Sequence, residues 1–516
     1  MVLLYLLFAY LVTGAVLKSP DCSPLSFRIP SPFGTKIQSI TASPVNNYSI
    51  FVPQNGANPT ASTNFTDLSF CNVTVTYTHP GQKGKIHVRV WLPFEWNGRF
   101  QGSGGGGWAA GLGAMSLAPG VALKYATATT DAGHSETDLI EFWALDSPGN
   151  VNLNALQDFA ATALGDMAAI GKAVTRRFYN KAAKYSYWNG CSTGGREGFM
   201  LVQRFPEAFD GVLAFSPVIN WAQVPTSTYW PQQVMKDLNY YPLPCEMAAI
   251  TARAIQACDE LDGVRDGIIS HPDQCKFDAH SLMGKSFNCG GRTLQFSSQA
   301  ATIANAAWNG PRSPSGSQLW YGIGKEARLM GIANTTCTGD TCTGAPLQLG
   351  ADWIKYFLAK DPQFSFANMT QAKYARLFHN SVQQYESIIG TDDPDLSEFR
   401  EAGGKMIAVH GLADELIPVS GTIDYYNDVE AGDKKVAEYF RFFAAPGMAH
   451  CASYVGPYPK DALASLVAWV ERGQAPDTLE AIDPKGEIVR DLCAYPKQQL
   501  YIGGNPKKAG SFTCSR

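Results

Sequence analysis

The sequence predicts an α/β protein in which helices cover a mostly parallel sheet and one long insertion interrupts the fold. Short apolar strands alternate with amphipathic helices up to residue 218, the alternation stops over 219–395, and it resumes over 396–516. Strands that alternate with helices favour a parallel sheet with helices on its faces. The C-terminal part alone has too few strands for a complete sheet. We therefore expect one domain built from 18–218 and 396–516, with a lid-like domain inserted at 219–395; two sequential domains are the alternative.

The order of elements follows from the spacing of apolar residues. Residues 70–95 alternate apolar and polar side chains on both sides of Pro80-Gly81, which predicts two paired strands. Residues 99–108 predict a strand end that runs into a glycine loop, and 153–178 carry apolar residues at helical spacing. Further runs predict strands at 125–129, 185–188, 212–215, 406–409 and 439–443, and helices at 196–205 and 462–470.

The composition excludes several classes of protein. The chain has 516 residues, 45% hydrophobic and 17% charged, and its 41 basic and 45 acidic residues give a net charge of −4. A chain of this length buries about 75% of its unfolded surface, so a large core needs neither a metal nor a disulfide. The charges nearly cancel and are not clustered, which argues against nucleic acid or a membrane as a partner. We expect no organic cofactor and make no prediction of oligomeric state.

The N-terminal segment predicts the compartment. Residues Val2 to Leu17 form an uncharged run that is shorter than the ~20 residues of a membrane-spanning helix. We interpret residues 1–17 as a secretory signal peptide, with a buried N-terminal strand as the alternative. A secreted, extracellular protein is expected to carry glycans at its Asn-x-Ser/Thr sequences, which are Asn47, Asn64, Asn72, Asn334 and Asn368.

The twelve cysteines fit six disulfides in an oxidising compartment, because their number is even. Free buried thiols are the alternative, and spacing alone does not determine the pairs. Neighbours in the sequence are the simplest pairs: Cys22–Cys71, Cys258–Cys275, Cys337–Cys342 and Cys493–Cys514. The partners of Cys245 and Cys289 stay open.

The strongest chemical motif is Gly190-Cys191-Ser192-Thr193-Gly194, which matches G-x-S-x-G. It lies between a predicted strand and a predicted helix, the context that a nucleophile elbow requires. The glycines permit a tight turn, and the serine hydroxyl projects at a helix start whose amides favour negative charge. An ordinary glycine-rich turn is the alternative.

A serine nucleophile needs a base and an acid that orients the base. In this fold the histidine comes last in the chain, after the acid. His450, after the strand ending near 443, and Asp414, just past the strand at 406–409, fit this order. Glu415 and Asp424 are rival acids. The remaining candidates are histidines, of which His410 more simply packs at a strand end and His134 could line the site.

Cys191 directly precedes the proposed nucleophile, and Cys451 directly follows the proposed base. If Ser192 and His450 approach each other, these cysteines come close enough for a disulfide to be considered. A Cys191 thiolate nucleophile is the rival, and an oxidising compartment argues against it.

The Cys-Ser, Asp and His-Cys segments together resemble the fungal tannase/feruloyl esterase family of secreted serine esterases, over nearly the whole mature chain. The resemblance implies an α/β-hydrolase fold with a large inserted lid domain, a Cys191–Cys451 disulfide and hydrolysis of phenolic acid esters. Family membership makes a feruloyl esterase acting on plant cell-wall material the first expectation and a tannase the second. A non-catalytic binding module on a hydrolase scaffold is the alternative of another class.

An acidic loop in the predicted lid, Cys258 to Ile268, carries three aspartates and two glycines. Hard oxygen ligands on such a loop suit calcium, although it is not an EF-hand because position twelve from Asp259 is Ser270. A solvated turn closed by Cys258–Cys275 is the alternative. The resemblance implies a structural Ca²⁺ whose ligands are Asp259, Asp262 and Asp266 by side chain and Val264 and Ile268 by carbonyl.

The expected reaction is acyl transfer from an ester to water through an acyl-enzyme on Ser192, with His450 as base and Asp414 as its partner. Oxyanion donors are expected from the amide of Thr193 and from Gly105 or its neighbour Gly104 in the glycine loop. Candidates to line an aromatic acyl pocket are Trp320, Tyr321, Trp353, Tyr356 and Phe357.

Overall fold

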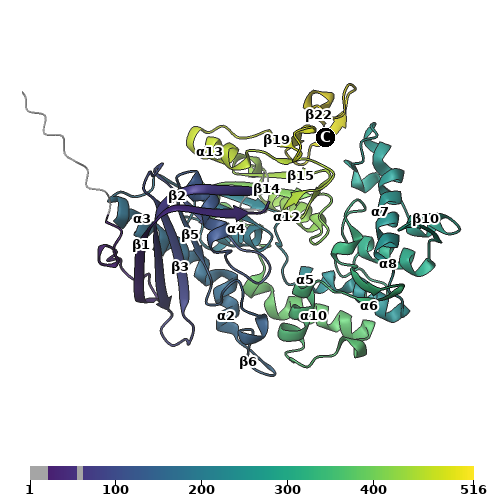
Figure 1. Ribbon diagram of the computed structural model, residues 1–516, viewed down its shortest axis with the longest axis horizontal. Coiled ribbons are helices and arrows are strands. Elements are labelled where there is room, and N and C mark those ends of the chain that lie inside the picture. The colour runs from purple at the N-terminus through teal and green to yellow at the C-terminus, as the bar shows by residue number, and fades with distance from the viewer. Residues whose placement is uncertain (1–20, 55–61, 516) are drawn as a thin grey trace, which may run out of the picture.

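The computed structural model describes residues 21–54 and 62–515, and the predicted signal peptide at 1–17 lies outside these residues. Its centre is a nine-stranded sheet in the order β1-β2-β3-β5-β4-β8-β9-β14-β15, flanked by helices and by a separate lobe (Figure 1). The predicted α/β architecture is therefore confirmed.

The sheet has an antiparallel part and a parallel part. β1 (Lys36–Val52), which the sequence patterns did not predict, pairs antiparallel with β2 (Thr63–Thr78), as do β2 with β3 (Ile86–Pro93) and β3 with β5 (Ala126–Thr130). The parallel strands are β5, β4 (Arg99–Ser103), β8 (Tyr185–Cys191), β9 (Gly211–Phe215), β14 (Lys405–Gly411) and β15 (Phe440–Ala445). Parallel strands bring their carboxyl ends to one edge, where the loops that follow them meet.

Two hydrophobic layers cover the two faces of the sheet, because successive side chains of a strand point to opposite faces. On β14, Met406 packs in the core that includes α3 (Ala163–Tyr179) and α12 (Val419–Gly432). The next residue, Ile407, packs in the core with α13 (Ala462–Arg472). Among residues 21–54 and 62–515, no helix has the length and apolar character needed to cross a membrane.

The predicted helix over 153–178 forms with a π-helical turn inside it. α2 (Leu153–Gln157), the π turn η3 (Asp158–Thr162) and α3 follow one another without a break. π turns are rare and often occur at functional sites. Two backbone carbonyls of η3 accept hydrogen bonds from the guanidinium of Arg196, a buried side chain of the helix that follows the elbow.

The chain leaves the sheet after β9 and returns to it at β14. These two strands are parallel neighbours, so residues 216–404 form an insertion between them. One part has its own core and forms the lobe at the right of Figure 1, with α6 (Trp230–Leu238), α7 (Pro244–Cys258) and α8 (Ser298–Asn309). The rest extends the main core. Its helices include α5 (Val224–Thr228), α9 (Gln348–Asp352), η8 (Trp353–Leu358), α10 (Gln371–Ile389) and α11 (Ser397–Glu401). The insertion also contains two small hairpins, β10 (Ser286–Cys289) with β11 (Arg292–Gln295) and β12 (Thr335–Thr338) with β13 (Thr341–Gly344).

The last forty residues form small sheets that the sequence patterns did not predict. β19 (Thr478–Ile482) pairs with β20 (Val489–Cys493), and β21 (Gln498–Tyr501) pairs with β22 (Phe512–Ser515). From β20, the Arg490 guanidinium reaches Asp266 of the acidic loop at 2.6 Å. This ion pair ties the C-terminal segment to the insertion.

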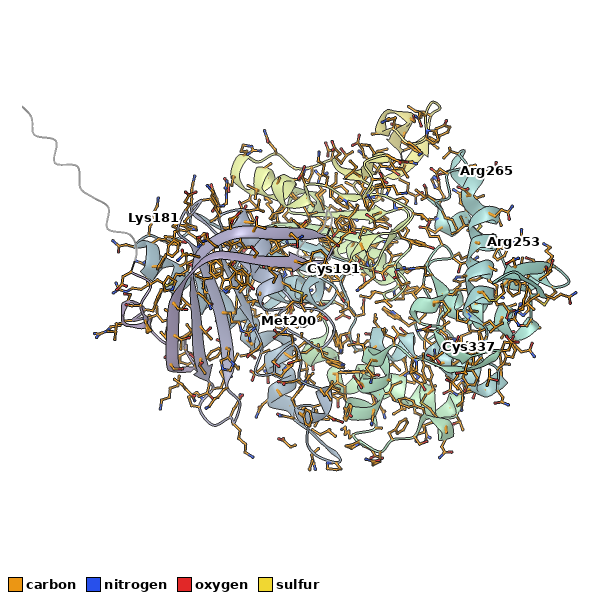
Figure 2. All side chains as sticks on the ribbon, viewed as in Figure 1. Lys181, Cys191, Met200, Arg253, Arg265 and Cys337 are labelled. Carbon is orange, nitrogen blue, oxygen red and sulfur yellow. A yellow bond between two sulfur atoms is a disulfide. The ribbon has the colours of Figure 1, made fainter. Side chains whose placement is uncertain are left out.

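All twelve cysteines are paired, and none is free. The four predicted neighbour pairs form, Cys245 pairs with Cys289, and Cys191 pairs with Cys451. In Figure 2, Cys191 lies near the centre of the molecule and Cys337 lies in the separate lobe.

Removal of the Cys22–Cys71 disulfide is expected to destabilise the protein more than removal of Cys337–Cys342. The first bridge closes a span of 49 residues and the second a span of 5. Loop-closure entropy gives about 4 kcal/mol for the first and about 2 kcal/mol for the second. Thermal melting of the C22A/C71A and C337A/C342A double variants tests this order. An equal or larger loss of Tm in the hairpin variant would contradict it.

Candidate active site

Ser192 stands at a sharp turn between β8 and α4 (Thr193–Arg204). Its backbone is in the left-handed region, with φ 61° and ψ −119°, which is strained for a non-glycine residue. A Cβ on Gly190 would lie 2.4 Å from the carbonyl oxygen of Gly194, so only glycine fits there. The predicted strand–turn–helix setting of the elbow is therefore present.

His450 and Asp414 meet beside this turn. His450 Nδ1 lies 2.9 Å from one carboxylate oxygen of Asp414 and 3.2 Å from the other. Asp414 follows β14 and is fixed by the amides of Leu416 and Ile417, which both donate to its Oδ1 at 2.9 Å. The acid and the base therefore have the mutual geometry of a catalytic pair.

The electrostatics of this pair suit a general base. Burial alone would raise the pKa of Asp414, but the facing His450 and His410 outweigh it and lower the pKa well below its ordinary value. Burial acts to lower the pKa of His450, but the negative charge and hydrogen bond of Asp414 raise it overall. Asp414 therefore stays ionised while His450 accepts a proton.

The Cys191–Cys451 disulfide joins the residue before Ser192 to the residue after His450. Its Cα atoms are 6.0 Å apart, across 260 positions of sequence. Ser192 and His450 line one cavity of about 290 Å³. Within the described residues no hydrogen bond joins the Ser192 hydroxyl to His450, as is common in enzymes without substrate. Because Cys191 is oxidised, it cannot act as a thiolate nucleophile.

The rival residues have other partners. Asp424 accepts a hydrogen bond from the Tyr321 hydroxyl, and Glu415 binds Arg328 while it also accepts from the amide of His450. His410 Nε2 lies 3.2 Å from Asp414 Oδ2, the same oxygen that His450 Nδ1 approaches at 2.9 Å, so it supports the acid. Among the rivals, only His410 and Glu415 touch the pair.

His134 is held away from Ser192. Its Nε2 lies 2.7 Å from the carbonyl of Trp108, and its ring stacks on Trp143. Neither this histidine nor Trp143 lines the cavity of Ser192.

The cavity walls are aliphatic rather than aromatic. The insertion contributes Val218, Val224, Thr228, Leu347 and Leu349, and the remaining aliphatic side chains are Leu112, Leu416 and Ile417. The expected aromatic lining is wrong for all five candidates, because none of them lines this cavity. Trp353 and Phe357 instead stack in the core with Trp108, where burial of large rings is most favourable.

The glycine loop after β4 places its amides differently from the expectation. The Gly104 amide donates to the carbonyl of Asn189 at 3.2 Å, and the Gly105 amide donates to Glu197 Oε2 at 3.1 Å. Both amides are therefore occupied by protein acceptors, and the prediction of Gly105 or Gly104 as an oxyanion donor is not supported by this arrangement. The Gly106 amide is also occupied, by Ala109.

Sequence reasoning missed Arg196 and Glu197, a fully buried pair on α4 directly behind the elbow. Two adjacent residues of opposite charge within an otherwise mostly apolar or small-residue stretch of the predicted helix could have indicated this buried pair. Glu197 contacts the glycine loop, and Arg196 contacts the π turn η3.

The acidic loop has the carboxylates that the sequence predicted, and all three accept hydrogen bonds from amides of the loop itself. Asp259 accepts from the amides of Asp266 and Gly267, Asp262 accepts from Val264, and Asp266 accepts from Ile268. Among the described residues, no three His, Cys, Asp or Glu side chains converge in a ready metal-binding arrangement. The second carboxylate oxygen of Asp262 is buried without a hydrogen-bond partner.

The acidic loop also contacts the segment that carries His450. Glu326, a buried side chain of the insertion, accepts from the amide of Ile269 at 2.9 Å and from the amide of Gly447 at 3.0 Å. Burial, with the nearby charges of Asp266 and Asp259, raises the pKa of Glu326 to about 7. The loop is distant from the elbow in sequence, but Glu326 links the residue that follows it to the segment that carries His450.

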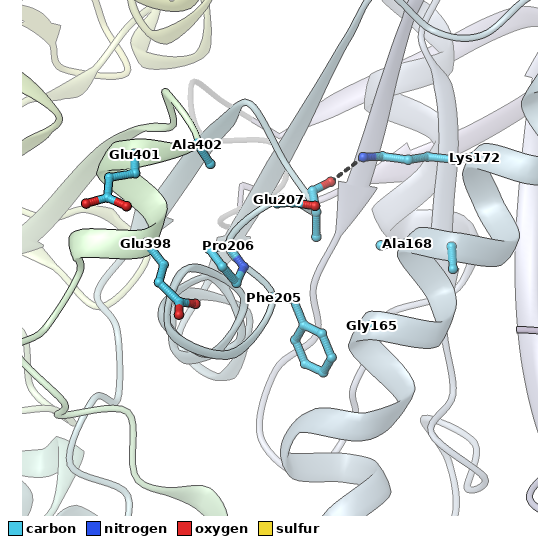
Figure 3. Close-up of a pocket in the computed structure, with 11 residues that line it drawn as sticks. Gly165, Ala168, Lys172, Phe205, Pro206, Glu207, Glu398, Glu401 and Ala402 are labelled. Atoms are coloured by element: carbon cyan, nitrogen blue, oxygen red, sulfur yellow. Dashed lines mark hydrogen bonds between the residues drawn. The ribbon is translucent and has the colours of Figure 1, made fainter. Parts of the chain in front are cut away.

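A second hollow lies away from all predicted site residues (Figure 3). It measures about 750 Å³ and runs between α3, the loop around Pro206 and α11. Its rim carries Glu207, Glu398 and Glu401, and its Lys172 ammonium donates to the carbonyl of Ala208. None of Ser192, Asp414 and His450 lines this hollow.

Comparison with known proteins agrees with the geometry. Residues 71–515 match the family model "Tannase and feruloyl esterase". A probable feruloyl esterase of Arthroderma benhamiae is 41% identical over 89% of this chain and 88% of its own length. A tannase of Aspergillus oryzae is 30% identical over 87% of this chain and 85% of its own length.

Solved structures agree as well. The tannin acyl hydrolase from Aspergillus niger superposes with a TM-score of 0.85 and 30% identity, covering 96% of this chain and 95% of its own. Feruloyl esterase B from Aspergillus oryzae superposes with a TM-score of 0.78 and 26% identity, covering 94% and 97%. The elbow, the buried acid–base pair and these matches together show that the chain belongs to the tannase and feruloyl esterase family.

Proposed function

We propose that this carboxylic ester hydrolase cleaves esters of hydroxycinnamic acids, of the feruloyl type, through an acyl-enzyme on Ser192. The observation that carries the proposal is the disulfide-linked pairing of the elbow with the His450–Asp414 pair around one cavity. Ser192 attacks the ester carbonyl while His450 takes its proton, and His450 then protonates the leaving alcohol. Asp414 holds the tautomer of His450 and stabilises its cation. In the second half of the reaction, His450 takes a proton from water as the water attacks the acyl-enzyme, and it returns this proton to Ser192 as the acid leaves.

The amides of Thr193 and Gly107 are the proposed oxyanion donors, in place of Gly105 or Gly104. Thr193 is the first residue of α4, where an N–H has no acceptor within the helix. In the glycine loop, the Gly106 carbonyl points inward to the amide of Ala109. The next amide, of Gly107, therefore points outward across the same planar trans peptide, and Gly107 lines the cavity with Ser192.

The aliphatic cavity supports a hydroxycinnamoyl group more than a galloyl group. Besides Ser192, Thr228 is the only residue with a side-chain hydroxyl among the described residues that line the cavity, and that hydroxyl donates to the carbonyl of Pro225 at 2.8 Å. A galloyl ring brings three hydroxyls and a feruloyl ring one. Each hydroxyl buried without a partner costs about 1–3 kcal/mol. The tannase alternative stays open, because the tannin acyl hydrolase has a higher TM-score than feruloyl esterase B.

A structural Ca²⁺ is proposed for the acidic loop, held by the side chains of Asp259, Asp262 and Asp266 and the carbonyls of Val264 and Ile268. Such an ion would neutralise buried carboxylates. Three observations fit it: the unpartnered oxygen of Asp262, the pKa of Asp266, which burial and Asp262 raise, and the raised pKa of Glu326. Through Glu326, order in this loop would extend to Gly447 and the His450 segment.

Secretion and glycosylation are proposed as well. Six disulfides persist only in an oxidising compartment, which supports an extracellular protein. Asn47, Asn64 and Asn368 are exposed, whereas Asn72 and Asn334 are half-buried. The exposed three are the favoured glycan acceptors.

Ser192→Ala is expected to abolish ester hydrolysis without unfolding the protein. Loss of the nucleophile lowers kcat by about 10⁵–10⁶-fold in comparable triads. Turnover of methyl ferulate by S192A, with Tm as the fold control, checks this. Near-normal turnover by a folded variant would refute the assignment of the nucleophile.

Methyl ferulate is expected to be a better substrate than methyl gallate by at least about 10-fold in kcat/KM, because two additional hydroxyls would be buried without partners. Steady-state kinetics of both esters on the same preparation give the ratio. A preference for methyl gallate would replace the feruloyl proposal by the tannase alternative.

Chelation is expected to lower Tm, and elemental analysis to find one calcium per chain. Saturation at 100 times Kd contributes about 2.7 kcal/mol of stability. Asp262→Asn should abolish the calcium content and the effect of EDTA on Tm. Asp273→Asn, an exposed residue of the same disulfide loop, is the matched control and should keep both. A protein that contains no calcium and whose Tm is unchanged by EDTA would show that the loop is only a solvated turn.

A further inference from the structure

The carboxyl of Glu197 is buried where an apolar side chain would be expected. Glu197 lies one turn into α4, five residues after Ser192, and has no exposed surface. Burying a carboxyl costs free energy unless specific contacts offset it. Its hydrogen bond is made with the amide of Gly105, at 3.1 Å from Oε2, while its Oε1 has no hydrogen-bond partner among the described residues.

This hydrogen bond belongs to a set of contacts that fastens the glycine loop to the elbow. The Gly194 amide donates to the Gly105 carbonyl at 3.1 Å, and the Thr193 hydroxyl donates to the Gly107 carbonyl at 2.7 Å. These two contacts hold carbonyl oxygens of the loop. Glu197 is the contact that holds its Gly105 amide from within α4, the helix that starts at Ser192.

The glycine loop packs directly against the Glu197 carboxyl, which therefore restricts the backbone conformation of the loop. A Cβ on Gly104 would lie 2.6 Å from Glu197 Oε2, so the backbone runs directly over the carboxyl. Without this acceptor, the Gly105 amide would be buried unpaired, or its peptide plane would turn to find another partner. A turned peptide at Gly105 changes the direction of the amides that follow, including that of Gly107.

We propose that Glu197 is a positioning residue of the reaction: by accepting from the Gly105 amide, it orients the glycine loop so that the Gly107 amide faces the oxyanion. This inference rests on the proposed function. Glu197 touches neither substrate nor reacting atoms, and it acts through the loop.

The charge state of Glu197 indicates which substitution preserves its role. Burial raises the pKa of Glu197 to about 8, against the opposing effects of Arg196 and the Gly105 amide. Arg196 is 3.9 Å away and is engaged with the carbonyls of Ala160 and Phe159 in η3. The raised pKa favours the neutral carboxyl, whose carbonyl oxygen accepts from the Gly105 amide. Glutamine has the same shape and the same acceptor in that state.

The test compares Glu197→Gln with Glu197→Met on methyl ferulate. Glutamine keeps the acceptor, and methionine keeps the length without one. We expect E197Q to retain kcat within about 3-fold. We expect E197M to lose about 10–100-fold in kcat with KM within 3-fold, because a misdirected oxyanion donor costs less than the 10²–10³-fold loss of a removed donor. The split between kcat and KM separates a positioning effect from a merely structural one.

Glu246→Met is the matched control. Glu246 is a buried glutamate of α7 that accepts from the Ser297 amide at 2.6 Å, in the separate lobe. We expect E246M to lower Tm and leave kcat unchanged. If E197M does not fold, Glu197→Asp takes its place, because a side chain shorter by one methylene cannot reach Gly105 and should lose kcat similarly.

Two results would overturn the proposal: an E197M or E197D protein with wild-type kcat, or an E197Q protein as impaired as E197M. Failure of the proposed function would appear elsewhere, as absence of ester hydrolysis by the wild-type protein or as full activity of S192A. The two failures are therefore distinguishable in one set of measurements.

Discussion

The disulfide between Cys191 and Cys451 is the constraint on which the rest of the site depends. It joins the last residue of β8 to the loop after β15 across 260 positions of sequence, and the nucleophile and the base lie directly beside the two linked cysteines. Both linked segments are strained, with positive φ at Ser192 and at Cys451. A cross-link between two strained turns keeps each in a conformation that the free chain would leave. The long insertion between β9 and β14 can then add walls to the cavity without displacing the catalytic groups.

Behind this link, the site is supported by buried ionisable side chains whose hydrogen bonds are made with the backbone. Asp414 holds two amides, Glu197 holds the glycine loop, and Glu326 joins the acidic loop to the histidine segment. Arg196 holds two carbonyls of the π turn η3. Each group would be costly to bury without its partners. Their common effect is to fix loops that contain little regular structure, and loops of this kind carry the reacting groups in α/β folds.

The sequence predicted those features of the fold and the site that depend on residues close together in the chain or on their order along it. The elbow, the order of Ser192, Asp414 and His450, and four neighbouring disulfides follow from motifs, chain order and short spacing. The proposal of Gly107 in place of Gly105 as an oxyanion donor rests on which peptide amides find acceptors inside the fold, which the sequence does not reveal. The aromatic pocket was wrong because Trp353 and its neighbours fill the core, and composition does not distinguish a core ring from a pocket ring. β1 and the strands of the small C-terminal sheets were missed because the alternation of apolar and polar residues alone does not reveal them.

The central claim is that one serine hydroxyl, activated by the clamped histidine, performs the chemistry. The most direct measurement is reaction of the folded protein with a serine-directed organophosphonate, followed by intact mass and peptide mapping. We expect one adduct per chain, on Ser192, formed at a rate that falls as His450 becomes protonated. A folded protein that takes no label, or that is labelled at another serine, would contradict it.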